Sequence, residues 1–408
     1  MLNLTKMNKR KFKMNYKILV VIALIFAMFT GHSQQSSDYV GRDLNTITTA
    51  VPFLLIAPDA RSGALGDAGV SSKPDANSMH WNPAKYAFIE KQMGFSVSYS
   101  PWLRALVNDI NLAYVSGYYR IDDRQVVAGS LLYFSLGDIT FTDVTGGRIG
   151  DYNPSKFSID ATYSRKLSEK LSGAITARYI NSNLTQGQYV AGVETHPGNS
   201  IAADVAVYWQ NDIVLGNMEG QFAWGINISN IGSKISYSDN EIKEFIPTNL
   251  RLGPSLTLEL DDYNTISFML DINKLLVPTP PIYKTDSMGL PEYENGKLVI
   301  LEGKDPDVSV ISGMLQSFYD APGGFSEEMR EFSYSIGAEY WYDKQFALRG
   351  GFFYEDKSKG NRKYFTLGAG LRYNVFGLDF AYLIPLEQHN PLENTLRFSL
   401  LFNFDAFN

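Results

Sequence analysis

The feature that most constrains the fold is a strict alternation of apolar with small or polar residues, in runs of 8–11 residues. One run places apolar side chains at every second position, at Phe222, Trp224, Ile226 and Ile228. The last run does the same at Leu396, Phe398, Leu400, Phe402 and Phe404. Because strand side chains point alternately to two faces, each run gives a sheet one apolar face. The run length is that of a tilted strand crossing a bilayer.

The same test along the chain predicts an all-β fold of fourteen strands. They lie near 93–100, 109–118, 125–135, 157–165, 171–180, 201–209, 219–229, 249–259, 264–272, 331–341, 345–354, 363–373, 376–384 and 395–404. Short connections alternate with longer ones, and 273–330 is the longest. An even strand number with sorted loops is typical of antiparallel transmembrane β-barrels, which have short periplasmic turns and long extracellular loops.

Charged residues within these strands fall on the small or polar side of the alternation. A charge on the lipid face is unfavourable, so these side chains should point into the lumen. Two interpretations stay open: a selectivity ladder in a pore, or a structural network that ties the wall to a plug. The residues are Asp160, Arg178, Asp204, Arg251, Glu259, Asp271, Glu339, Arg349, Arg372, Asp379 and Arg397.

Composition excludes several classes of protein. With 45% hydrophobic and 19% charged residues, the chain can bury a core and is not of the disordered type. Acidic residues outnumber basic ones, 43 to 36, so there is no basic footprint for nucleic acid. The absence of cysteine excludes disulfides and thiolate metal sites, and the four histidines are not at metal-ligand spacing. We therefore expect no metal and no cofactor.

The first residues resemble an export signal. Six basic residues precede a twelve-residue apolar run from Ile18 to Phe29, and Gly31-His32-Ser33 supplies small residues for cleavage. The run is too short to span a bilayer as a helix. We predict a signal peptide at 1–33, a periplasmic or lumenal hatch at 34–92, and a barrel at 93–408.

The predicted hatch is rich in apolar and small residues, and small residues permit close backbone packing. The segment of most interest runs from an apolar stretch to an Asn-Pro turn. The candidate hatch residues are Phe53, Leu54, Leu55, Trp81, Asn82 and Pro83. The apolar ones could line a path for small molecules, or could simply pack the plug against the wall.

The long loop at 273–330 contains a predicted short helix, capped by Asp307 and followed by Gly323-Gly324. Its apolar residues recur at helical spacing. They could pack back on the barrel mouth, or they could form an apolar surface for a protein partner. The candidate partner-binding residues are Leu275, Leu276, Val277, Val308, Ile311, Met314, Leu315 and Phe318.

Several sequence blocks occur in order along the chain: 60–70 (ARSGALGDAGV), Trp81-Asn82-Pro83-Ala84, 320–325 (DAPGGF) with Glu327-Glu328, 337–342 (GAEYWY) and 348–352 (LRGGF). Together they resemble the FadL-type outer-membrane barrels, and most closely the PorV family of the type IX secretion system. The resemblance implies a fourteen-stranded barrel with an N-terminal hatch in the cell outer membrane.

The resemblance also implies a role in handling protein partners. Members of that family associate with the giant translocon barrel, receive cargo through its C-terminal signal domain, and deliver it to the sortase of the attachment complex, where cargo is joined to lipopolysaccharide. Outer-membrane lipid is thus a further expected neighbour, although nine acidic against five basic residues in 273–330 disfavour direct binding of phosphate-rich lipid by that loop. The alternative function is a FadL-type channel for hydrophobic small molecules.

An enzymatic role is not expected. A lipid-modifying barrel would need a serine activated by a histidine. The mature chain has no His-x-Ser pair and no Gly-x-Ser-x-Gly elbow, and His80, His196 and His389 have no adjacent serine in the sequence. We therefore predict no catalytic residues.

Overall fold

The computed structural model describes residues 44–408 except 104–106, 108, 143–144, 186, 188, 191–192, 240–242, 388–389 and 406–408. The predicted signal peptide, the first ten hatch residues (34–43) and His389 lie outside the described residues. Within the described part of the chain, no helix is both long and apolar enough to span a membrane.

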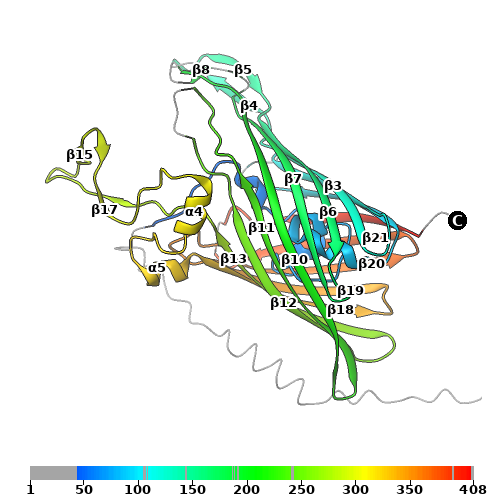
Figure 1. Cartoon of the computed structure of the whole chain (residues 1–408). Helices are drawn as coiled ribbons and strands as arrows, with labels where there is room; N and C mark the ends of the chain where they lie inside the picture. The colour runs from blue at the N-terminus through cyan, green and yellow to red at the C-terminus, as the bar shows by residue number, and fades with distance from the viewer. Residues whose placement is uncertain are drawn as a thin grey trace, which may run out of the picture. The chain divides into compact units, whose positions relative to one another are not determined.

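Fourteen antiparallel strands close into one barrel, which confirms the predicted fold class (Figure 1). Each lies at its predicted position, with ends shifted by at most three residues except in β10, which continues six residues past its predicted end at 209. They are β1 (Met93–Pro101), β2 (Asn111–Arg120), β3 (Gln125–Ser135), β6 (Ser155–Lys166), β7 (Leu171–Asn183), β10 (Gly198–Leu215), β11 (Met218–Gly232), β12 (Asn249–Glu259), β13 (Asn264–Leu275), β18 (Phe332–Tyr342), β19 (Phe346–Tyr354), β20 (Lys363–Tyr373), β21 (Phe376–Pro385) and β22 (Leu396–Phe404). The pairing of β1 with β22 closes the barrel.

The two faces of the wall differ as the alternation predicts. Outward-facing aliphatic side chains such as Ile175, Ile201 and Leu348 are 66%, 72% and 65% exposed. Inward-facing neighbours such as Ser164 and Thr176 are fully buried. An apolar outer band on a closed barrel is typical of outer-membrane barrels, whose strands present lipid-facing and lumen-facing residues in turn.

The connections are sorted between the two ends of the barrel. Tight turns join strand pairs such as β10–β11 at 216–217 and β20–β21 at 374–375. The long connections carry their own small elements and gather at the other end (Figure 1). These are β4 (Ile139–Thr142), β5 (Arg148–Tyr152), β8 (Tyr189–Val190), β9 (Val193–Glu194), β14 (Ile282–Tyr283), β15 (Tyr293–Glu294), β16 (Lys297–Leu298), β17 (Ile300–Glu302), α4 (Val310–Gln316) and α5 (Phe325–Arg330).

The hatch runs through the lumen from the long-loop end to the short-turn end. Near its start, the Asn45 side chain donates to Pro280 O at 3.1 Å in the long loop. Near its end, Lys91 pairs with Asp405 just after the last strand. Between them lie four short helical elements, η2 (Pro52–Leu55), α2 (Ala60–Gly63), α3 (Ser78–Trp81) and η3 (Pro83–Phe88).

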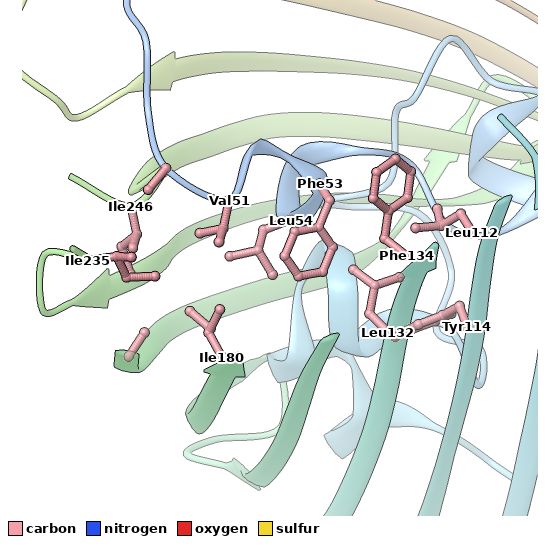
Figure 2. Close-up of a cluster of buried hydrophobic side chains, with 12 residues drawn as sticks. Val51, Phe53, Leu54, Leu112, Tyr114, Leu132, Phe134, Ile180, Ile235 and Ile246 are labelled. Carbon is pink, nitrogen blue, oxygen red and sulfur yellow. The ribbon is translucent and has the colours of Figure 1, made fainter. Parts of the chain in front are cut away.

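The largest apolar cluster joins the hatch to the wall (Figure 2). Phe53 and Leu54 of η2 are 2% and 5% exposed, and the Phe53 ring stacks on Phe134 of β3 with centroids 6.2 Å apart. Leu112, Leu132 and Ile180 are among the wall residues of this cluster. Burying side chains of this size stabilises the fold by about 1.5–3 kcal/mol each, so the hatch is part of the core.

Candidate functional site: a fixed hatch and an exposed loop surface

Trp81, Asn82 and Pro83 are buried at the centre of the hatch. Trp81 Nε1 donates to Asp59 Oδ1 at 2.6 Å, and Asp59 Oδ2 caps α2 by accepting from Ser62 N at 2.9 Å. The Asn82 side-chain oxygen caps η3 by accepting from Ala84 N at 3.0 Å. The predicted motif is therefore a set of helix caps that hold the hatch in its folded form.

Asn82 also ties the hatch to the wall. Its Nδ2 donates to Val70 O in the hatch and to Val207 O in β10, both at 3.0 Å. On the next strand, Asn227 Nδ2 donates to Trp81 O at 3.1 Å. An unpaired buried carbonyl is unfavourable, so these bonds fix where the hatch lies.

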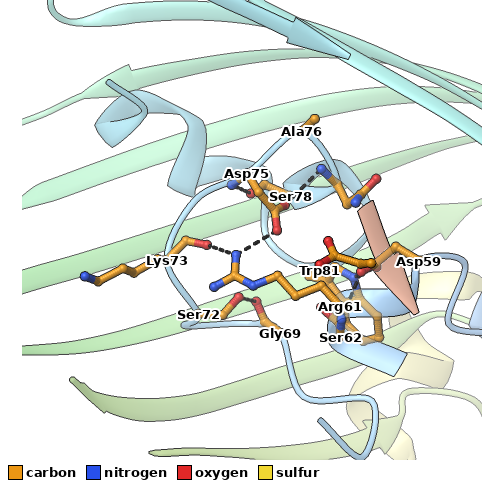
Figure 3. Close-up of polar contacts among 12 residues, drawn as sticks. Asp59, Arg61, Ser62, Gly69, Ser72, Lys73, Asp75, Ala76, Ser78 and Trp81 are labelled. Atoms are coloured by element: carbon orange, nitrogen blue, oxygen red, sulfur yellow. Dashed lines mark hydrogen bonds and ion pairs between the residues drawn. The ribbon is translucent and has the colours of Figure 1, made fainter. Parts of the chain in front are cut away.

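Arg61 links the hatch to a row of charges on the barrel wall. Its guanidinium binds Glu339 of β18 through two nitrogens. Within the hatch, Arg61 Nη1 lies 2.8 Å from Asp75 and 3.0 Å from Lys73 O (Figure 3). Glu339 also accepts from Arg349, which in turn pairs with Asp379 at 2.8 Å. The row crosses strands β18, β19 and β21 and includes one hatch residue.

Most of the other charges predicted to face the lumen are also bonded within the protein. Arg178 pairs with Asp160 at 2.6 Å and with Asp204 at 3.0 Å, and Asp271 Oδ2 accepts from the amides of Gly69 and Val70 in the hatch. Of the eleven predicted residues, Glu259 is exposed at its strand end and Arg372 is half-buried, while the rest are buried. These contacts favour the structural network over a selectivity ladder, because most of the charges are paired within the protein or bonded to the hatch.

Burial shifts the pKa values of several hatch groups, among them Asp59 and Lys85. It raises the pKa of Asp59 to about 6, and the nearby charge of Asp75 adds to this. It lowers the pKa of Lys85 to about 8. Lys85 Nζ donates to Gly69 O at 2.7 Å and to Ser72 Oγ at 3.0 Å, so the amine holds the turn of the hatch together rather than pairing with a carboxylate.

Backbone contact between hatch and wall depends on glycine. A Cβ added to Gly351 of β19 would lie 2.1 Å from Gly66 N and from Leu65 C. Gly350, its neighbour on the outward face, has nothing closer than 3.9 Å. The hatch backbone therefore rests directly on the inner face of β19, where any side chain would displace it.

The base of the long loop is held by a buried charge cluster. Lys274 Nζ lies 2.5 Å from Glu331 and 3.3 Å from Glu328, and Lys359 pairs with Glu327 and Glu331. Asp320 Oδ2 accepts from Thr279 N at 3.1 Å. These bonds join both ends of the loop to each other and to the 355–362 loop, so the loop is a fixed platform.

The platform presents apolar side chains outward. In α4 and just after it, Ile311, Leu315 and Phe318 are 60%, 64% and 45% exposed. The opposite face is anchored by Gly313, where an added Cβ would lie 2.9 Å from the Phe245 ring. We name the exposed set the loop surface; it comprises Ile311, Leu315, Phe318, Tyr319, Phe325 and Met329.

Some predicted details of the loop need correction. The cap of α4 is Ser309, which accepts from Ser312 N, and not Asp307, because the helix starts two residues later than the apolar spacing suggested. Leu276 and Val277 are 3% and 2% exposed, so they pack inside the mouth and are not a docking surface. Leu275, Val308 and Met314 are half-buried. The second helix, α5, was not predicted, although its start after Gly323-Gly324 could have suggested it.

No group of three or more potential metal ligands occurs among the described residues. His80 lies in α3, with its ring centroid 4.8 Å from that of Trp81. Burial lowers its pKa well below the ordinary value, so it is neutral in the folded hatch.

A closed fourteen-stranded antiparallel barrel with its own N-terminal segment folded into the lumen defines the class, a transmembrane β-barrel of the outer-membrane type. The family model described as "Type IX secretion system protein PorV" matches residues 40–282. The match covers more than half of the chain, and the chain belongs to the PorV family. A search of curated proteins gives no match.

The solved structures found to be similar share little sequence identity with this chain. The toluene transporter TodX of Pseudomonas putida has 12% identity and a TM-score of 0.47, with 90% of this chain and 100% of that chain covered. The toluene transporter TbuX of Ralstonia pickettii has 12% identity and a TM-score of 0.44, with 85% and 98% covered. A Pseudomonas aeruginosa FadL homologue has 11% identity and a TM-score of 0.40, with 88% and 99% covered.

Proposed function

We propose that this protein is a cargo shuttle of type IX secretion in the cell outer membrane. It binds the C-terminal signal domain of secreted cargo, docks on the giant translocon barrel, and delivers cargo to the sortase for attachment to the cell surface. Membership of the PorV family supports the secretion system. The individual shuttle steps go beyond what family membership supports. They require no catalytic residue in this chain.

The observation that carries the proposal is the loop surface. Six large apolar side chains are 45–80% exposed on two short helices and the link between them, at the long-loop end of the barrel. Exposed apolar patches on a rigid support are typical of protein-binding sites. The buried lysine–glutamate cluster below supplies that support. The occupant we assign is the cargo signal domain, because the family belongs to a protein secretion system.

The hatch contacts support partner binding over conduction. Arg61, Asn82 and the backbone beside Gly351 fix the hatch to separate strands of the wall. A passage for hydrophobic molecules would require these buried contacts to break together, and breaking a buried ion pair by removing one partner costs about 3–5 kcal/mol. We therefore place the channel function second.

The test compares two triple variants. Ile311→Ser, Leu315→Ser and Phe318→Ser together replace three of the six apolar side chains of the loop surface with polar ones, and they leave Gly313 on the buried side of α4 unchanged. Met288→Ser, Leu290→Ser and Tyr293→Ser form the control, since these residues are also exposed in the same loop, at 79%, 58% and 68%. The readout is binding of a purified cargo signal domain to the full-length protein in detergent.

The proposal predicts that the loop-surface variant loses binding by about a hundredfold, given that a few residues carry most interface energy. The control should bind like the unmodified protein. The change in gel mobility on heating shows whether each variant is folded. If both variants are folded and bind the signal domain equally, this surface is excluded as the cargo site.

A further inference from the structure

A small cavity lies where the hatch meets the base of the long loop. Its volume is about 80 Å³, and it is bordered by Leu55 and Trp81 of the hatch and by Arg251 and Phe353 of the wall. A water molecule needs about 10–15 Å³ by this measure, so the cavity has room for a group of several heavy atoms. Its walls are partly aromatic and partly charged.

Most charged side chains around the cavity have an opposite charge of their own. Asp67 lies 3.1 Å from Arg397, Glu355 lies 2.7 Å from Arg362, and Glu331 pairs with Lys274 and Lys359. These pairs are complete without any ligand. A buried charge is stable only when it is paired and hydrogen-bonded.

Arg251 of β12 is the exception among the described residues that line the cavity. Its Nε donates to Asn273 Oδ1 at 2.7 Å, and its guanidinium lies over the Trp81 ring, 4.5 Å from the centroid. No carboxylate lies within 4.0 Å of it in the described part of the chain, and its two Nη groups have no hydrogen-bond partner there. Asp271, on the neighbouring strand, is bound instead by the amides of Gly69 and Val70.

The geometry therefore points to a carboxylate-binding site: we propose that the two Nη groups of Arg251 hold a carboxylate in this cavity, with its small apolar substituent against Leu55, Trp81 and Phe353. A guanidinium matches a carboxylate through two parallel hydrogen bonds. The cation–π contact with Trp81 and the hydrogen bond to Asn273 hold the guanidinium in place at the cavity. This proposal does not depend on the secretion role.

The remaining charges favour a monoanion over phosphate. Asp67, Glu331 and Glu355 all border the cavity. A phosphate dianion would meet their negative charge with only one unpaired cation to offset it. The volume limits the ligand to the size of a short-chain acid or to the last residue of a peptide with a free carboxyl end. These two sources share the same chemistry.

The test uses the full-length protein in detergent and 19F NMR line broadening of trifluorobutyrate as the probe. We expect binding, which acetate and butyrate displace and inorganic phosphate does not. Arg251→Gln should weaken binding by about tenfold or more, because the two charge-assisted bonds are lost. Arg251→Lys keeps the charge but not the geometry for two parallel hydrogen bonds. Its affinity for the probe should lie between those of the unmodified protein and Arg251→Gln.

Arg165→Gln is the matched control, because Arg165 is an exposed arginine at the end of β6. It should bind like the unmodified protein. Two peptides distinguish the two sources: one with a free carboxyl end, and the same peptide with an amide end. If only the peptide with the free carboxyl end displaces the probe, the ligand is a chain terminus. If neither peptide displaces the probe, the ligand is a free small acid. Absence of probe binding, equal displacement by phosphate, or full binding by folded Arg251→Gln and Arg251→Lys would overturn the proposal.

Discussion

Arg61 of the hatch and Glu339 of strand β18 form an ion pair inside the barrel that is joined by two hydrogen bonds. Arg61 Nη2 lies 2.8 Å from Glu339 Oε1, and Arg61 Nε lies 3.0 Å from Glu339 Oε2. The two residues are 278 positions apart in the sequence, and both side chains are buried. This pair joins the hatch to the row of wall charges formed by Glu339, Arg349 and Asp379.

Removing the hatch side of this pair should destabilise the whole protein. Arg61→Ala leaves Glu339 and Asp75 without their shared cation, and we expect a loss of about 3–5 kcal/mol. Lys91→Ala is the control, because its pair with Asp405 is exposed, and it should cost no more than about 1 kcal/mol. Denaturant unfolding of the detergent-folded protein measures both. Equal losses for the two variants would contradict the network.

The glycines of β19 allow a second test within one strand. Gly351→Val places a side chain where the backbone of Leu65 and Gly66 now lies, while a Cβ at Gly350 points outward and has no neighbour closer than 3.9 Å. Overpacking of this kind costs about 1–3 kcal/mol or more, so Gly351→Val should loosen the hatch and Gly350→Val should not. Ion conductance in planar bilayers and proteolysis of the hatch report the difference. If Gly350→Val had the larger effect, the hatch would not rest on this face.

Asn82 can be tested by separating its two roles. Asn82→Asp keeps the oxygen that caps η3 but loses the amide that donates to Val70 O and Val207 O. Asn82→Ala loses both roles. We expect Asn82→Asp to cost at least about 1–3 kcal/mol, because two buried carbonyls then face a carboxylate. An unfolding free energy unchanged in Asn82→Asp would show that only the cap matters.

The long loop should respond to pH through Asp320. Burial raises the pKa of Asp320 to about 6, and the nearby Glu328 and Glu331 act in the same direction. In the unfolded loop the carboxyl has its ordinary value of 3.8. Between these values the folded loop binds more protons than the unfolded one, so its stability is greatest at low pH and falls as pH rises through about 6.

The expected effect is an increase in opening of the loop base by about ten- to a hundredfold between about pH 4 and pH 7. Hydrogen exchange at the Thr279 amide, which donates to Asp320, measures it after correction for intrinsic exchange. Asp320→Asn keeps an acceptor for that amide and should remove the pH dependence. The same pH dependence in Asp320→Asn would assign it to another group.

The barrel could be predicted from the sequence because its two faces meet different surroundings, so that lipid and lumen impose period 2 on every strand. Strand ends were less certain because strands such as β10 continue past the apolar band, to Leu215. The pairing of Arg61 with Glu339 could not be predicted, since nothing local relates a hatch residue to one strand among fourteen.

The loop shows the same division between local and distant information. The helical spacing of Ile311, Leu315 and Phe318 predicted α4 but not the direction its apolar face takes. That direction is decided by Gly313, which allows α4 to lie on Phe245 from another loop. Likewise the lack of a carboxylate partner for Arg251 among the described residues depends on how hatch, wall and loop meet, and no pattern in the sequence reveals it.

The most direct test of the shuttle proposal is gentle detergent purification of the tagged protein from its native outer membrane, followed by mass spectrometry of the proteins that accompany it. The proposal predicts recovery of a very large barrel, or of secreted proteins that still carry their C-terminal signal domains. Recovery of the protein alone, with a bound fatty acid or another hydrophobic molecule, would contradict it and favour the channel function.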